Sequence, residues 1–191
     1  MRHAVAFLLA TLAWLPLAGA QAPAKPESVA PSVYTPAGVV DEIMQMAAVG
    51  PGDYVVDLGS GDGRLVIAAV AKYKARGGFG VDINPMMITL SNQNAVTAGV
   101  ADRVKFYERD LFATDVSEAT VVTIYLLPSI MAKVEMKLLA ELKPGTRVVV
   151  HDFPFPNWKA DKVIAVDSLD KIATTGFAFT QLYFYTVPPR R

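Results

Sequence analysis

The chain has 191 residues, contains no cysteine, and carries 18 Lys and Arg residues against 18 Asp and Glu residues, so its formal charge is zero. This length indicates one domain, and 52% hydrophobic against 19% charged residues indicate a globular chain. A neutral chain without a long basic run is a poor general binder of nucleic acids, and the lack of cysteine excludes disulfides, thiolate zinc sites and a cysteine nucleophile.

The start of the chain has the layout of a secretory signal peptide. Residues 1–20 combine a basic start, an apolar run over 4–17 and an Ala-Gly-Ala cleavage site. The run is short for a membrane span, so we expect no stable span after cleavage. A flexible linker is expected over 21–33 and the folded domain over 34–191. The pattern predicts an exported protein, periplasmic or secreted. The alternatives are an uncleaved anchor, or a cytoplasmic protein whose start codon is misassigned.

Helices and strands are expected to alternate along the domain. Thr35 as N-cap and Pro36 as first helical residue predict a helix over 36–49. Further helices are predicted over 64–75, over 85–98, and around an apolar face formed by Met131, Val134, Leu138 and Leu142. Strands are predicted at 54–58, 79–82, 104–107, 120–126, 146–151, 163–166 and 180–187. Alternation implies a parallel sheet with right-handed crossovers, and a hairpin of the final pair makes the last strand antiparallel. We predict an α/β, doubly wound, Rossmann-like fold.

The most informative segment joins the first strand to the following helix. Asp57 ends an apolar strand, and the loop over 59–63 has glycine at every second position. Glycine has no Cβ and tolerates positive φ, so a ligand can lie against this backbone. Asp82, at the end of the next strand, offers a carboxylate to ribose hydroxyls. Arg64 stands where a dinucleotide fingerprint needs its third glycine, and no P-loop lysine follows. The pattern therefore favours a nucleoside cofactor without phosphate, S-adenosylmethionine.

Other site residues are expected just after the strands, where ligands of doubly wound sheets bind. Asp57 offers an acceptor to the ammonium group of the cofactor. Asp110 and Leu111 follow the third strand and offer a polar acceptor and apolar cover to adenine. His151, at the end of the fifth strand, is interpreted as a wall residue, with a general-base role as the alternative. No metal site is expected, because no other histidine follows the signal peptide.

The methyl acceptor is expected at the end of the fourth strand. Tyr125 offers a hydroxyl that can orient an amine, and aromatic faces stabilise cationic amines. The predicted catalytic residues surround the opening of the pocket at this strand end. They are Tyr125, Pro128, Phe153 and Trp158. The alternative is that the aromatic residues only form core or wall and that Pro128 only shapes the turn.

Six short segments, in one order, resemble the small seven-strand protein-lysine methyltransferases that include the ATP synthase c-subunit lysine methyltransferase. They lie at 34–36, 55–64, 84–85, 110–111, 127–129 and 153–158. The resemblance implies the strand order 3-2-1-4-5-7-6 and S-adenosylmethionine as cofactor. The implied cofactor-binding set is Tyr34, Thr35, Asp57, Gly59, Ser60, Gly61, Asp82, Ile83, Asp110 and Leu111.

Two features depart from that family. Asp82 stands where the mitochondrial relatives carry glutamate, a mild chemical change. The predicted signal peptide is the larger departure, because S-adenosylmethionine is made in the cytosol.

The resemblance implies transfer of a methyl group to a lysine amine of a protein. Two alternatives stay open at this point. One is a methyltransferase of the same fold that acts on a small molecule. The other is an exported binding protein that has lost catalysis.

The signal-peptide interpretation predicts the mature N-terminus. N-terminal sequencing of the protein recovered from cells should read Gln21 as the first residue. Protein that retains Met1 would contradict cleavage.

Overall fold

The computed structural model describes residues 34–167, 172 and 179–190. The expected signal peptide and linker lie outside the described residues and stay predictions, as does the turn expected between the last two strands. Within the described residues, no helix is both long enough and apolar enough to cross a bilayer.

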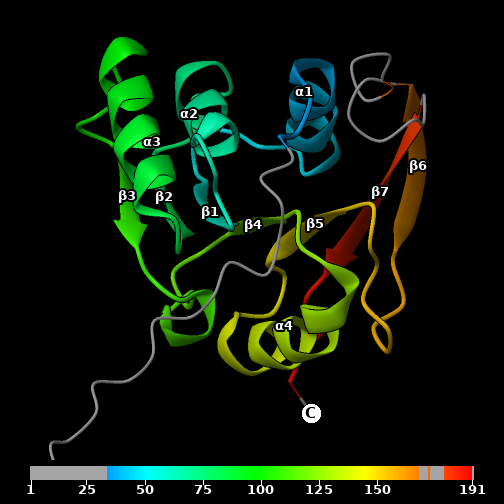
Figure 1. Cartoon of the computed structure of the whole chain (residues 1–191). Helices are drawn as coiled ribbons and strands as arrows, with labels where there is room; N and C mark the ends of the chain where they lie inside the picture. The colour runs from blue at the N-terminus through cyan, green and yellow to red at the C-terminus, as the bar shows by residue number, and fades with distance from the viewer. Residues whose placement is uncertain (1–33, 168–171, 173–178, 191) are drawn as a thin grey trace, which may run out of the picture.

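The domain is a seven-stranded sheet with helices on both faces (Figure 1). The strands are β1 (Tyr54–Leu58), β2 (Gly77–Asp82), β3 (Val104–Glu108), β4 (Val121–Ile124), β5 (Arg147–His151), β6 (Lys162–Asp167) and β7 (Phe179–Thr186). The helices are α1 (Ala37–Met46), α2 (Arg64–Ala71), α3 (Pro85–Thr97) and α4 (Pro128–Glu141), with a 3₁₀ turn η1 (Leu111–Ala113).

The strand order is β3-β2-β1-β4-β5-β7-β6, which confirms the predicted order. The first five strands pair in parallel, whereas β7 is antiparallel to both β5 and β6. Because the register places Leu58 opposite both Val81 and Ile124, the carboxyl ends of β1, β2 and β4 are level. The residues that follow these strands therefore lie along one edge of the sheet.

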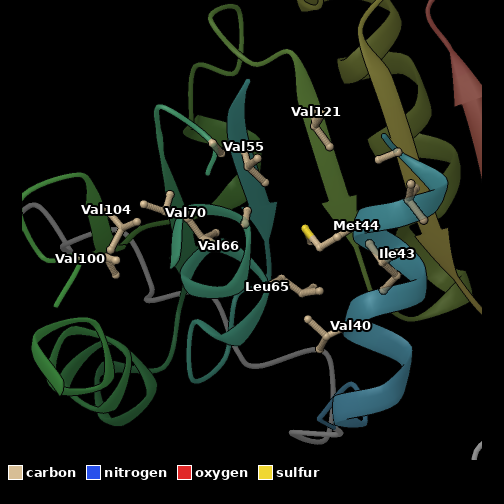
Figure 2. Close-up of a cluster of buried hydrophobic side chains, with 14 of the residues drawn as sticks. Val40, Ile43, Met44, Val55, Leu65, Val66, Val70, Val100, Val104 and Val121 are labelled. Atoms are coloured by element: carbon tan, nitrogen blue, oxygen red, sulfur yellow. The ribbon is translucent and has the colours of Figure 1, made fainter. Parts of the chain in front are cut away.

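Two apolar cores lie on the two faces of the sheet, because successive strand residues point to opposite faces. Val55 and Val121 pack with α1 and α2, including Ile43 and Met44, as Figure 2 shows. Val56, Leu58, Val122 and Ile124 pack on the other face, against the α4 residues Met131, Val134 and Leu138. The predicted apolar face of α4 is confirmed, since all three of these side chains are buried and Leu142, just beyond the helix, is buried as well.

The first helix starts one residue later than predicted. Pro36 is the N-cap of α1, and no side chain caps that helix. The Thr35 hydroxyl, expected as the cap, instead lies 3.4 Å from Nδ1 of His151. A tertiary contact across 116 residues has replaced the local one.

The sequence predicts that residues 76–78 end the preceding helix and lie before the next strand. In the structure, β2 already begins at Gly77. A Cβ on Gly78 would lie 2.2 Å from the carbonyl oxygen of Val55. The glycine therefore permits close approach of β2 to β1, and the strand starts two residues before the predicted range. The helix before it is shorter than predicted and ends at Ala71, with Lys74 in the left-handed region at φ 64°.

Candidate functional site

The glycine loop is fastened to the end of β2 by backbone hydrogen bonds. The N–H groups of Gly59 and Ser60 both donate to the carbonyl oxygen of Val81, each at 2.9 Å. The N–H of Gly61 donates to Oδ2 of Asp82 at 3.0 Å. The three loop glycines have φ of 86°, 50° and 82°, which a side chain would strain. The loop is thus a fixed turn whose backbone is open to a ligand.

Asp82 holds the loop and still has acceptor capacity for a ligand. Its Oδ2 accepts from Gly61, and its Oδ1 accepts from the N–H of Asn84 at 2.8 Å. An ionised carboxylate has about four lone-pair sites, so each oxygen has a second one. The predicted contact with ribose hydroxyls is compatible with this arrangement.

Asp57 is almost fully buried beneath the loop, at 3% exposure. It lies opposite Thr123 in the register of β1 and β4, and the Thr123 hydroxyl donates to its Oδ1 at 2.7 Å. Burial raises the pKa of Asp57 to about 7, the hydrogen bond from Thr123 lowers it, and the nearby carboxylates of Asp82 and Asp62 raise it further. A cationic group placed here would relieve this repulsion.

The residues before α1 form a second wall, which we call the N-terminal strap and define as Tyr34 and Thr35. Arg64 binds both strap residues: its guanidinium lies 4.8 Å from the centroid of the Tyr34 ring and donates to the carbonyl oxygen of Thr35 at 2.7 Å. Asp62 fixes this guanidinium through Nε and Nη2, at 2.9 and 2.6 Å. The strap is therefore tied to the glycine loop.

Tyr125 comes directly after β4 and faces the strap side. Residues 121, 123 and 125 share one face of their strand, and His151 lies on the same face at the end of β5. The rings of Tyr125 and His151 stack with centroids 3.8 Å apart, and the Tyr125 hydroxyl donates to Oδ2 of Asp152 at 3.1 Å. His151 is only 1% exposed and packs as a buried residue beside Tyr125, so its interpretation as a wall residue stays a prediction.

A small hollow of about 40 Å³, partly open to solvent, brings these parts together. This volume is well below the roughly 300–1,000 Å³ usual for ligand sites, so these residues enclose only part of a binding site. The residues that line it come from the strap, the glycine loop, α2 and β4: Tyr34, Thr35, Asp57, Gly59, Ser60, Gly61, Asp62, Arg64, Leu65 and Tyr125. The structure thus places six predicted cofactor residues and one predicted catalytic residue in one cavity.

The chemistry of the hollow fits S-adenosylmethionine. The Ser60 hydroxyl is buried without a hydrogen-bond partner, a state that costs about 1–3 kcal/mol and that a polar ligand could relieve. Asp57 in the cavity wall and Asp82 beside the loop add negative charge, which disfavours a phosphate and favours a cation. A nucleoside with a sulfonium and an ammonium group meets both conditions.

The remaining predicted cofactor residues do not line this hollow. Asp82 reaches it only through its contact with the loop at Gly61, and Ile83 follows β2 and is half-buried. Asp110 accepts at 2.8 Å from the N–H of Phe112 and so starts η1, and Leu111 packs against the α4 core. The predicted roles of Ile83, Asp110 and Leu111 stay predictions.

Three predicted catalytic residues also lie outside the hollow. Pro128 is the first residue of α4 and is exposed. Phe153 packs against the α4 core. Trp158 stacks on Phe155, with the ring planes 10° apart, and lies 5.1 Å from the ring of Tyr185. The placements of Phe153 and Trp158 match the alternative of core and wall residues, and an acceptor role for all three residues stays a prediction.

Several residues of the site escape the sequence analysis. The glycine pattern marks Arg64 only as a missing glycine, although it ties the strap to the loop. Thr123 and Thr180 carry no motif, and only the alternation along β4 and β7 could have placed them on the face of Asp57 and His151. Asp152 follows β5 directly, a position that itself suggests a site residue.

Comparison with known proteins identifies methyltransferases as relatives. The sequence profile of the ANTKMT methyltransferase domain matches residues 57–162. A protein-lysine N-methyltransferase of Saccharolobus islandicus (strain REY15A) is 41% identical over 137 residues, which are 72% of this chain and 85% of the relative. The ATP synthase c-subunit lysine N-methyltransferase of Mus musculus is 42% identical over 110 residues, 56% of this chain. The chain spans 42% of that mouse protein's length.

Solved structures share the fold. An RNA methyltransferase from Salinibacter ruber, in complex with S-adenosyl-L-homocysteine, has 43% identity and a TM-score of 0.74, covering 83% of this chain and 96% of that one. A methyltransferase from Geobacter sulfurreducens, in complex with the same compound, has 15% identity and a TM-score of 0.59, covering 78% and 91%. The second likeness concerns the fold alone.

Asp82 gives the first prediction for this site. Replacing Asp82 with Ala should weaken binding of S-adenosylhomocysteine by about 5- to 150-fold, equivalent to about 1–3 kcal/mol, because charge-assisted hydrogen bonds are lost. Isothermal titration calorimetry measures this. Asp102→Ala is the control, since the Asp102 side chain is 76% exposed. Equal affinity of the Asp82→Ala variant and the native protein would place the ribose elsewhere.

Asp57 predicts a pH dependence of stability. Its folded pKa of about 7 exceeds the ordinary value of 3.8, so the folded state holds this proton more tightly than the unfolded state does. The contribution of Asp57 is therefore favourable at low pH and is lost as the pH rises toward and through 7. The free energy of unfolding should fall by about 2–3 kcal/mol between pH 5 and pH 8. Urea denaturation measures it, and Asp57→Asn should remove this component. An identical slope in that variant would contradict the prediction.

Proposed function

The chain belongs to the ANTKMT methyltransferase family, and from this premise we propose that it transfers methyl groups from S-adenosylmethionine to lysine side chains of a protein. One observation carries the proposal: the acidic nucleoside hollow and the Tyr125 hydroxyl, which can orient an amine, share one cavity. The relatives named as protein-lysine methyltransferases support the choice of acceptor.

The chain's own residues divide the work between binding and orientation. Asp82 and the glycine loop would hold the ribose, and Asp57 and Ser60 would face the charged amino-acid part of the cofactor. The strap covers this side of the hollow. When bound, the cofactor supplies a methyl group already activated by the sulfonium charge. Much of the catalysis can therefore come from positioning the acceptor.

The acceptor amine must be neutral to react. Its nitrogen lone pair would form the new N–C bond, and the electron pair of the broken C–S bond would stay on sulfur. The methylated nitrogen becomes positively charged and then releases a proton to solvent. Tyr125 lines the hollow, and its hydroxyl oxygen would accept an N–H of that amine and stabilise the developing charge.

RNA is a second candidate acceptor, because the Salinibacter ruber relative is named an RNA methyltransferase. The formal charge of zero favours protein over RNA, since phosphate contacts require many Lys and Arg residues. A small-molecule acceptor is the remaining alternative.

Export stays a proposal that rests on residues 1–20 alone. An exported enzyme would have to receive its cofactor from outside the cytosol, so the supply of S-adenosylmethionine and the site of action are linked questions.

A labelling experiment tests the acceptor class. The domain over residues 34–191 and the full chain are incubated with methyl-labelled S-adenosylmethionine and a cell extract, which is then split into protein, RNA and small-molecule fractions. We expect label in protein, on methylated lysine identified by mass spectrometry. An extract whose lysines have been chemically acetylated is the matched control: an amide nitrogen has no free lone pair for the methyl group, so its lysines should accept no label. Label confined to RNA or to small molecules would overturn the proposal.

A further inference from the structure

Asp152 has an unusual backbone for a residue that is not glycine. Its φ is 62°, and the N–H of Phe153 donates to the carbonyl oxygen of His151 at 2.8 Å. A hydrogen bond from residue i+2 back to residue i around a positive φ is the pattern of a γ-turn, which is rare and strained. Such strain persists where the surroundings enforce it, and it is frequent at functional sites.

The surroundings of Asp152 enforce it through β7. The N–H of Asp152 donates to the carbonyl oxygen of Gln181 at 2.8 Å. In return, Oδ1 of Asp152 accepts from the Thr180 hydroxyl at 2.6 Å and from the N–H of Gln181 at 3.2 Å. Oδ2 of Asp152 accepts from the Tyr125 hydroxyl at 3.1 Å and lies 3.8 Å from Nε2 of His151.

The directions of these hydrogen bonds follow from one another. A carboxylate only accepts, so the single hydrogen of the Thr180 hydroxyl goes to Asp152. The Thr180 oxygen must then accept from Nε2 of His151, with which it is in contact. Nδ1 of His151 lies 3.4 Å from the Thr35 hydroxyl of the strap, and which of the two atoms donates depends on the tautomer of His151.

The same rule fixes the hydroxyl of Tyr125. Its only hydrogen is donated to Asp152, so its oxygen offers lone pairs alone to any further partner. Burial, together with the charge and hydrogen bond of Asp152, raises the pKa of Tyr125, so the phenol stays protonated at neutral pH. Tyr125 is therefore a neutral acceptor on the wall of the hollow.

We propose that Asp152 is a positioning residue for the methyl-acceptor nitrogen, acting through Tyr125. By taking the phenolic hydrogen, Asp152 makes Tyr125 an acceptor for an N–H of the incoming amine, so that the nitrogen lone pair stays free for the methyl group. A phenol turned the other way would donate its hydrogen to that lone pair and block attack. This inference rests on the proposed amine methylation.

Replacing Asp152 with Asn tests the direction of the hydrogen bond with little change of shape. Asn tolerates positive φ, and its Oδ1 can keep the contacts with Thr180 and Gln181. Its amide NH₂ then faces Tyr125, which must accept, and the phenolic hydrogen turns outward. We expect the rate of lysine methylation to fall about 10- to 100-fold.

The design is a double-mutant cycle with Tyr125→Phe. Initial rates are measured with labelled S-adenosylmethionine and the protein fraction of a cell extract. In the Tyr125→Phe background, Asp152→Asn should change the rate by less than about threefold, because the two residues act as one unit. Asp161→Asn is the matched control: Asp161 also accepts an N–H of β7, from Thr186, and this change should leave the rate unaltered.

Two readouts do not depend on turnover. The affinity for S-adenosylhomocysteine should stay within about twofold in Asp152→Asn, since Asp152 does not line the hollow. In an absorbance titration, comparison with Tyr125→Phe identifies the signal from ionisation of Tyr125. This signal should appear at lower pH in Asp152→Asn than in the native protein, because the neighbouring negative charge is gone.

The outcomes separate this inference from the proposed function. Equal loss of rate from Asp152→Asn with and without the Tyr125 hydroxyl overturns the positioning role, as does an unchanged rate. A native protein that methylates no lysine overturns the proposed function and the acceptor role with it. The tyrosine titration would then still decide whether Asp152 holds the phenolic hydrogen.

Discussion

The site depends on one constraint: the glycine loop is clamped to the end of the neighbouring strand. Three successive N–H groups, those of residues 59–61, donate to the carbonyl of Val81 and the carboxylate of Asp82. These bonds provide acceptors for the N–H groups of a sharp turn. They also place the Asp82 carboxylate, the predicted acceptor for ribose hydroxyls, beside the loop. The level strand ends then bring Asp57, Thr123 and Tyr125 to the same edge of the sheet, where the cavity lies. The residues predicted to bind the cofactor and those predicted to orient the acceptor are therefore positioned by the same strand ends.

Much of the fold could be predicted because local and global signals agree. The alternation of strands and helices, the glycine after α3 and the apolar face of α4 all reflect short-range patterns, and the structure confirms them. The wrong boundaries have tertiary causes. Thr35 contacts His151 instead of capping α1, and Gly78 lets β2 approach β1. Neither contact leaves a trace in neighbouring sequence.

The residues that line the hollow were predictable around the glycine loop and less so around Tyr125. A sharp glycine turn and an acid at a strand end leave a sequence motif, so Asp57, the glycine loop and Asp82 could be recognised from the sequence. Aromatic residues leave no such motif, because aromatic side chains occur both in hydrophobic cores and at the openings of binding sites. Trp158 accordingly packs with Phe155 and Tyr185, whereas Tyr125 lines the hollow. Thr180 and Gln181 contact Asp152, and Thr180 also contacts His151, relations that the pairing of distant strands creates.

The strap has a consequence for local stability. Tyr34 and Thr35 precede α1 and belong to no strand, so polar contacts with Arg64 and His151 hold them, not sheet pairing. Such segments open at a smaller cost than the sheet beneath them. Changes at Arg64 or His151 would therefore loosen this wall of the hollow, while the strand pairing beneath it stays unaltered.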